Sequence, residues 1–178
     1  MSRWVALLGS INVGGNRLKM AELRAALEQA GLANVATVVA SGNVLFDHPE
    51  EAEAELERRI AQVVKDRFGI DSFVAVRSRA ELQAAIADNP FASDGEPKLV
   101  HTMFLAEPFD RVRFEAFAHR WPDPERLAPG DRAFFVDYVE TVGRSKLDAA
   151  MAKAKLISGR ATARNIRSLR RIADAMDR

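Results

Sequence analysis

The sequence predicts an α+β protein made of two halves, residues 1–77 and 78–178, and three observations lead to this prediction. Segments with the apolar pattern of a strand alternate with segments of helical period along the whole chain. In the first half these segments follow the order β-α-β-β-α-β, which is the order of a ferredoxin-like (βαββαβ) domain. The chain has 178 residues, of which 48% are apolar, and this content can form the core of one or two small domains.

The first half combines short buried strands with two amphipathic helices. The expected elements are a strand at 3–9, a helix at 20–30, two strands within 36–47, a helix at 49–68 and a strand at 72–77. Gly31 and Gly69 stop the two helices, and Ser41-Gly42-Asn43 is typical of a hairpin turn. A right-handed crossover makes the first two strands parallel. We therefore expect the loop after the first strand and this turn to lie side by side at one end of a four-stranded antiparallel sheet.

The second half repeats the pattern less regularly. Its expected elements are a helix at 79–87, a strand at 98–106, a helix at 110–121 and two strands within 126–141 that turn at Pro129-Gly130-Asp131. Ser78 and Glu81 form a capping box for the first of these helices. In place of a fourth strand, the sequence predicts that the second half ends in two helices, at 145–157 and 163–176. Ser145 and Thr162 are their expected caps.

Composition excludes several kinds of site. The chain has no cysteine, so disulfides and thiol catalysis are absent, and its three histidines, His48, His101 and His119, offer little for a zinc site. We predict no metal and no cofactor. No apolar stretch approaches the ~20 residues of a membrane helix, and no signal-peptide core is present. We therefore expect a cytoplasmic protein that does not contact a membrane.

Charge is distributed unevenly along the chain. Residues 1–142 contain 16 Lys/Arg and 22 Asp/Glu, a net charge of −6, whereas residues 143–178 contain 10 and 3, a net charge of +7. Such asymmetry favours a polyanionic or phosphorylated partner. Docking of the basic segment on the protein's own acidic body explains it equally well.

The first candidate site combines the two polar loops of the first half. Its residues are Asn12, Gly14, Gly15, Asn16, Ser41, Gly42 and Asn43. Consecutive glycines let backbone N–H groups approach a ligand, and the asparagines supply neutral donors. The stretch lacks the lysine and Ser/Thr of a P-loop and does not fit G-x-G-x-x-G. A tight turn with positive φ at the glycines is the alternative interpretation.

The second candidate site lies at the two basic helix starts. Its residues are Arg144, Ser145, Lys146, Thr162, Arg164 and Asn165. Cations at a helix N-terminus are unfavourable by ~0.3–1 kcal/mol each, so a bound anion would compensate them. Ion pairs with carboxylates of the acidic body would do the same.

Several motifs together resemble a known family. The stretches INVGGN, MAELRAALEQAG, SGNVLF, DNPFA, GRSKL and ATARNIRSL, in this order, are similar to an uncharacterised family of bacterial proteins known only as a domain of unknown function. The similarity covers nearly the whole chain and implies a small α+β protein with two ferredoxin-like halves, without implying an activity. The sequence departs from the family pattern at Gly9-Ser10, where an Arg-Gly pair is usual, at Ile166, where Trp is usual, and at Ser168, where Thr is usual.

Three functions remain open from the sequence. The first is binding of a phosphorylated or otherwise anionic small ligand, such as a nucleotide, by the two loops and the basic helix starts. The second is an enzyme acting on a small phosphorylated metabolite, for which Asp137, Tyr138 and His101 are the available candidates as a base. The third is an RNA-binding or protein-interaction module. The strands lack the interleaved aromatic residues of RNA-binding sheets, which weakens RNA as a partner. The sequence does not indicate an oligomeric state.

Overall fold

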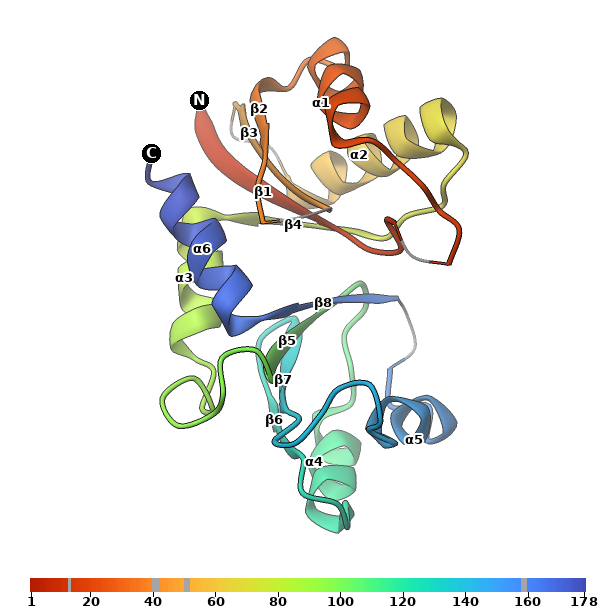
Figure 1. Ribbon diagram of the computed structural model, residues 1–178, viewed down its shortest axis with the longest axis vertical. Helices are drawn as coiled ribbons and strands as arrows, with labels where there is room; N and C mark the ends of the chain where they lie inside the picture. The colour runs from red at the N-terminus through yellow and green to blue at the C-terminus, as the bar shows by residue number, and fades with distance from the viewer. Residues whose placement is uncertain (13, 40–41, 50–51, 158–159) are drawn as a thin grey trace. The chain divides into compact units, whose positions relative to one another are not determined.

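The computed structural model describes residues 1–12, 14–39, 42–49, 52–157 and 160–178. These residues form eight strands and six helices, which divide into two compact units (Figure 1). Unit 1 contains residues 1–83 and 171–178, and unit 2 contains residues 84–170. The predicted α+β fold with two ferredoxin-like halves is confirmed.

Unit 1 is built on one four-stranded antiparallel sheet with the order β2-β3-β1-β4. The strands are β1 (Ser2–Leu8), β2 (Ala33–Thr37), β3 (Asn43–His48) and β4 (Val74–Ser78). Helices α1 (Met20–Gln29) and α2 (Glu53–Phe68) cover one face of this sheet (Figure 1). The first and third strands, β1 and β3, are therefore central neighbours in this sheet.

The core of unit 1 forms where α1 and α2 pack on the sheet. Leu23 and Leu27 of α1 and Leu56 and Ile60 of α2 are each completely buried, and they pack with Trp4 of β1. Their spacing of four residues within each helix places each pair on one face, as the helical period requires. The helices therefore form because their apolar stripes have a sheet to cover.

Unit 2 has a second four-stranded antiparallel sheet with the order β6-β7-β5-β8. The strands are β5 (Val100–Leu105), β6 (Arg126–Pro129), β7 (Ala133–Asp137) and β8 (Ala161–Asn165), and the helices on the sheet are α4 (Arg111–Arg120) and α5 (Leu147–Lys153). Phe114 of α4 and Leu147 of α5 are completely buried in the core with Phe134 of β7. None of the helices in the described part of the chain has both the length and the apolar content needed to cross a bilayer.

The strand β8 corrects one sequence-based expectation. The sequence predicts a helix from residue 163, but residues 161–165 pair with β5 and the helix α6 (Ile166–Met176) begins only after them. The other late helix is also shorter than predicted, because α5 begins at Leu147 rather than at residue 145. The second half therefore contains all four strands of the ferredoxin-like pattern, and its last two helices are separated by a strand.

A helix follows the fourth strand directly in both halves. The helix α3 (Arg79–Ala87) begins after β4 with the predicted capping box, in which the Ser78 N–H donates to the Glu81 carboxylate at 2.8 Å. In the second half Asn165 takes the corresponding place, since its side-chain oxygen accepts from the Ser168 N–H at 2.8 Å. The chain is thus a repeat of seven elements, βαββαβα, in both halves.

Candidate functional site

Two loops of unit 1 meet at one end of its sheet. β1 ends at Leu8, and β3, its antiparallel neighbour, begins at Asn43. The backbone N–H of Leu8 donates to the carbonyl of Gly42 at 2.8 Å, which joins the loop after β1 to the turn before β3 (Figure 1). The predicted juxtaposition of these loops is confirmed. We call residues 9–19 together with residues 38–43 the loop end.

Three asparagines that the sequence suggested as ligand donors hold the loop end together. The Asn12 side chain donates to the Leu18 carbonyl at 3.2 Å and accepts from the Leu18 N–H at 2.8 Å. The Asn16 amide donates to the Ser10 carbonyl at 3.1 Å, and the Asn43 amide donates to two carbonyls of its own turn, at 3.2 and 2.8 Å. These contacts account for the asparagines without a ligand.

Unusual backbone conformation is concentrated at the loop end. Of the twelve described residues with positive φ, six lie there: Ser10, Asn12, Gly14, Gly15, Val39 and Gly42. A β-branched residue such as Val39, whose φ is 51°, is rarely found in this region. Non-glycine residues in this conformation cost of order 1–3 kcal/mol and are typical of ligand-binding segments. Ser41, also a predicted site residue, lies outside the described residues.

The sign of the backbone angle φ alternates along residues 10–12, and this pattern is typical of anion-binding loops. Ser10 and Asn12 have φ of 58° and 56°, whereas Ile11 between them is not in the positive region. Successive residues of alternating handedness turn their backbone N–H groups toward a common concavity, which favours anions. A Cβ built on Gly14 or Gly15 would meet no atom within 4 Å, so the space beside these glycines is open.

Arg17 supplies a positive charge at the loop end. Its side chain is exposed, and it makes no ion pair with any residue in the described ranges. Lys19, by contrast, lies 3.8 Å from the Glu22 carboxylate. Arg17 is therefore a cation of this loop that is available to a ligand.

The structure places Ser145 beside a carboxylate. Its hydroxyl donates to Glu125 and accepts from the Leu147 N–H at 3.2 Å. Arg144 and Lys146 on either side are exposed. Because α5 begins at Leu147, Ser145 is not its N-cap, and the Glu125 carboxylate opposes a second negative charge at the serine. This segment is therefore a less favourable anion site than the sequence indicated.

Thr162, Arg164 and Asn165 lie on β8 and not in the first turn of a helix, which corrects their predicted setting. The Arg164 guanidinium donates to the Thr162 hydroxyl and to the Ala163 carbonyl, both at 2.8 Å. Burial lowers the pKa of Arg164 to about 10, so the group remains charged at neutral pH. Asn165, as described above, caps α6. These residues are engaged in the fold.

The two basic segments also lie on different faces of the second sheet. Ala163 packs against the core that contains Leu147 of α5. Successive side chains of a strand point to opposite faces, so Thr162 and Arg164 face away from α5 and from Ser145. The predicted cooperation of the two segments in one anion site is not supported by this arrangement.

The residues considered as a catalytic base are occupied by other contacts. Asp137 accepts from Arg126 at 2.6 and 3.0 Å, and the Tyr138 hydroxyl donates to Asp148 at 2.8 Å. Burial and the Asp148 carboxylate raise the pKa of Tyr138 far above its usual value. The His101 ring lies edge-on to the Tyr138 ring at 5.2 Å, and burial lowers the pKa of His101. This cluster has the character of a buried structural network.

Sequence reasoning missed Arg17 and Glu125 as residues that shape these sites. The sequence could have indicated Arg17, because this residue lies two positions after Gly14-Gly15. Nothing in the sequence indicates that Glu125 contacts Ser145, since the two residues lie 20 positions apart.

Comparison with known proteins places the fold and the family. The conserved bacterial protein SP0830 from Streptococcus pneumoniae has a similar structure, with a TM-score of 0.78 and 22% sequence identity over 100% of this chain and 99% of that one. No curated protein gave a significant match to the sequence. The model of the family described as protein of unknown function (DUF1697) matches residues 1–135. Since this match spans most of the chain and includes the whole loop end, the protein belongs to the DUF1697 family.

Proposed function

We propose that the protein binds a small anionic ligand, of the phosphorylated and nucleotide-like class, at the loop end of unit 1. The observation that carries this proposal is the concentration of positive-φ residues in the loop that ends β1 and in the turn that precedes β3. The strain is maintained by the Asn12 and Asn16 hydrogen bonds. Strained backbone of this kind gathers at ligand-binding segments, so a ligand is the reason we infer for it.

The proposed ligand contacts are the backbone N–H groups of Ser10, Ile11, Gly14 and Gly15, together with the Arg17 guanidinium; the Asn12 N–H instead donates to the Asn16 carbonyl at 2.7 Å. Backbone N–H groups in a loop of alternating φ bind the oxygens of a phosphate or carboxylate, and a guanidinium adds a charge-assisted hydrogen bond. Such a bond contributes about 1.5–3 kcal/mol, which corresponds to roughly 10- to 100-fold in affinity. A phosphorylated metabolite is a ligand that the cytoplasm supplies, in agreement with the location that we expect from the sequence.

Thermal unfolding with a ligand panel tests the proposal. The panel contains inorganic phosphate, AMP, ATP and ribose 5-phosphate, each compared with sodium chloride at equal ionic strength. A ligand at 100 times its Kd stabilises a protein by about 2.7 kcal/mol, which is a readily measured rise in Tm. We expect at least one compound to raise the Tm of the wild-type protein.

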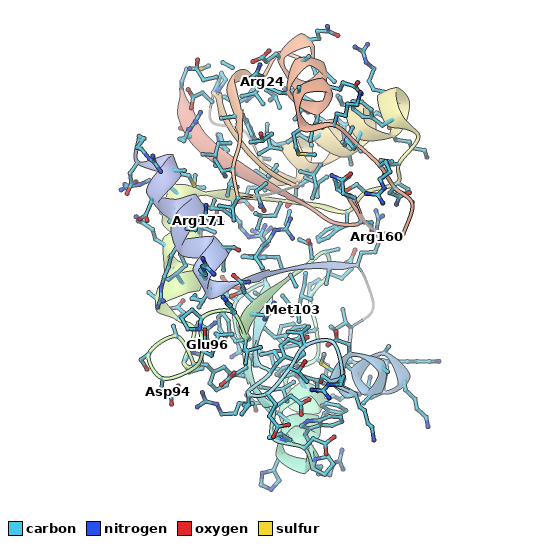
Figure 2. All side chains as sticks on the ribbon, in the orientation of Figure 1. Arg24, Asp94, Glu96, Met103, Arg160 and Arg171 are labelled. Carbon is cyan, nitrogen blue, oxygen red and sulfur yellow. The ribbon has the colours of Figure 1, made fainter. Side chains whose placement is uncertain are left out.

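Arg17→Ala and Arg24→Ala form the matched pair of variants. Both remove one exposed arginine from unit 1, and Arg24 extends from α1 rather than from the loop end (Figure 2). Arg17→Ala should reduce the ligand-dependent rise in Tm while Arg24→Ala leaves it unchanged. Equal responses of the two variants, or no response of the wild-type protein to any compound, would contradict the proposal.

Polyanion binding is a second candidate, and one observation favours it. Arg167 and Arg171 are exposed on α6, four residues apart and thus on one face, and neither makes an ion pair within the described part of the chain. Binding of an RNA oligomer through this face should weaken steeply with salt, with a slope of about −0.7 per phosphate contact in log K against log salt. A recessed small-ligand site should show weak salt dependence. If the affinity falls steeply with salt and Arg17→Ala does not change it, the binding surface is α6 and not the loop end.

A further inference from the structure

The two halves of the chain match in their loop hydrogen bonds as well as in their elements. At the end of β1 the Leu8 N–H donates to the Gly42 carbonyl at 2.8 Å, and at the end of β5 the Leu105 N–H donates to the Arg132 carbonyl at 3.2 Å. One residue later, the Gly9 N–H donates to the backbone carbonyl of the residue before β4 at 2.7 Å. In unit 2, the N–H of the first residue after β5 donates to the backbone carbonyl of the residue before β8 at 2.8 Å. Unit 2 therefore has its own version of the loop end, formed by residues 106–111 and 130–132.

The residue before the third strand differs between the two versions of the loop end. Gly42 and Arg132 occupy the same place before the third strand of each sheet, with φ of 84° and 52°. Glycine takes this conformation freely, whereas a residue with a side chain is disfavoured there by roughly 1–2 kcal/mol. Unit 2 thus holds a guanidinium at a position where the backbone alone would favour glycine.

This end of unit 2 contains a cavity of about 380 Å³. Its lining comes from the loop after β5, the start of α4 and the turn between β6 and β7: Leu105, Ala106, Glu107, Pro108, Phe109, Arg111, Gly130, Asp131 and Arg132. The volume lies at the lower end of the ~300–1,000 Å³ range of small-molecule sites. Leu105, Pro108 and Phe109 provide an apolar wall, so the cavity suits a small ligand with an apolar body.

The charged residues that line the cavity indicate which charges the ligand must have. Arg111, Glu107 and Asp131 are exposed side chains, and none of them makes an ion pair or side-chain hydrogen bond with the residues described. A ligand that is only anionic would meet two carboxylates, and a ligand that is only cationic would meet the Arg111 guanidinium. A zwitterion places a charge of the appropriate sign near each.

We propose that this cavity of unit 2 binds a free amino acid with an apolar side chain. The ligand carboxylate pairs with the Arg111 guanidinium, the ligand ammonium pairs with Glu107 and Asp131, and the side chain lies against Leu105 and Phe109. This site is separate from the loop end of unit 1 and does not depend on whether that end binds an anion.

Two-dimensional NMR of the ¹⁵N-labelled full chain, titrated with L-phenylalanine, tests the proposal. We expect saturable shifts of the amide signals of residues 105–107, 109–111 and 130–132. 3-Phenylpropionate, which lacks the ammonium group, and phenethylamine, which lacks the carboxylate, should each bind about tenfold more weakly, because each loses one charge-assisted contact.

Variants locate the contacts independently of the analogues. Arg111→Gln should weaken L-phenylalanine binding about tenfold, whereas Arg120→Gln, at the other end of the same helix, should leave it unchanged. Asp131→Asn, in a surface turn, should also weaken it and provides a second probe should Arg111→Gln fail to fold. The proposal is overturned by the absence of saturable shifts with L-phenylalanine, by shifts confined to other residues, or by binding of either single-charge analogue as tightly as L-phenylalanine.

Discussion

Replacement of Asn12 by alanine should destabilise unit 1, because this side chain closes the loop after β1. Asn12 accepts from the Leu18 N–H at 2.8 Å and donates to the Leu18 carbonyl at 3.2 Å. Leu18 is buried, with 7% of its surface exposed, so its backbone groups would have little access to water after the substitution. The φ of Asn12 is 56°, a conformation that asparagine tolerates better than alanine does.

The expected magnitude combines these two effects. Two side-chain hydrogen bonds contribute about 0.5–1.5 kcal/mol each. The left-handed conformation adds roughly 1 kcal/mol for alanine relative to asparagine. We therefore expect Asn12→Ala to lower the free energy of unfolding by about 2–4 kcal/mol. Asn12→Gly is the control, because it removes the same hydrogen bonds but adopts positive φ freely, and it should be less destabilising than alanine.

Urea denaturation followed by tryptophan fluorescence measures this change in unit 1 alone. The chain has two tryptophans, and Trp4 lies in the core of unit 1 whereas Trp121 belongs to unit 2. In a Trp121→Phe background, the fluorescence of Trp4 reports the unfolding of unit 1. A loss below about 0.5 kcal/mol for Asn12→Ala, the size of ordinary surface substitutions, would refute the role of Asn12 in closing the loop.

Three further predictions concern unit 2. Arg126→Ala leaves the buried Asp137 carboxylate without its guanidinium partner, and because Arg126 itself is partly exposed, urea denaturation should show a loss of about 1–3 kcal/mol. Because burial lowers the pKa of His101 below its ordinary 6.5, the unfolded chain takes up the proton first as the pH falls. Stability should therefore be retained above pH 6.5 and decline below it, by at most ~1.4 kcal/mol per pH unit from this group, and unfolding curves of His101→Gln should lack this part of the decline. Arg164→Ala, which removes the hydrogen bonds to Thr162 and to the backbone, should lower the Tm without any ligand, by an amount equivalent to about 1–3 kcal/mol; an unchanged Tm would show that these bonds contribute nothing.

The sequence predicted the first half well because its signals are local. Gly31 stops α1 with a φ of 93°, and Gly69 ends α2 with a φ of 67°. The apolar residues of α1 and α2 follow the helical period, and the crossover rule then fixes which loops share an end of the sheet. Each of these inferences needs only residues that are close in sequence.

The strand β8 could not be predicted in this way. Residues 161–165, ATARN, include two alanines and an arginine, which favour a helix when considered alone. These residues form a strand because β5 offers its free edge to them, with Thr102 opposite Arg164 and Phe104 opposite Thr162. Pairing with a strand some 60 residues earlier overrides the local preference.

The meeting of the two loops of unit 1 was predicted, but the roles of their side chains were not. The two loops of unit 1 do meet, yet their asparagines brace the backbone. At Ser145 the carboxylate of Glu125, contributed from a distant part of the sequence, changes the electrostatic character of the segment. Long-range contacts of this kind have no signature in a single sequence.

Mapping of a bound anion on the chain tests the central claim most directly. ¹⁵N-labelled protein is titrated with ATP and, separately, with inorganic phosphate, and the amide signals are followed by two-dimensional NMR. The account predicts saturable shifts at Ser10–Gly15, Arg17 and Gly42. Shifts centred on Arg144–Lys146 or along α6, or no saturable shift with either compound, would contradict it.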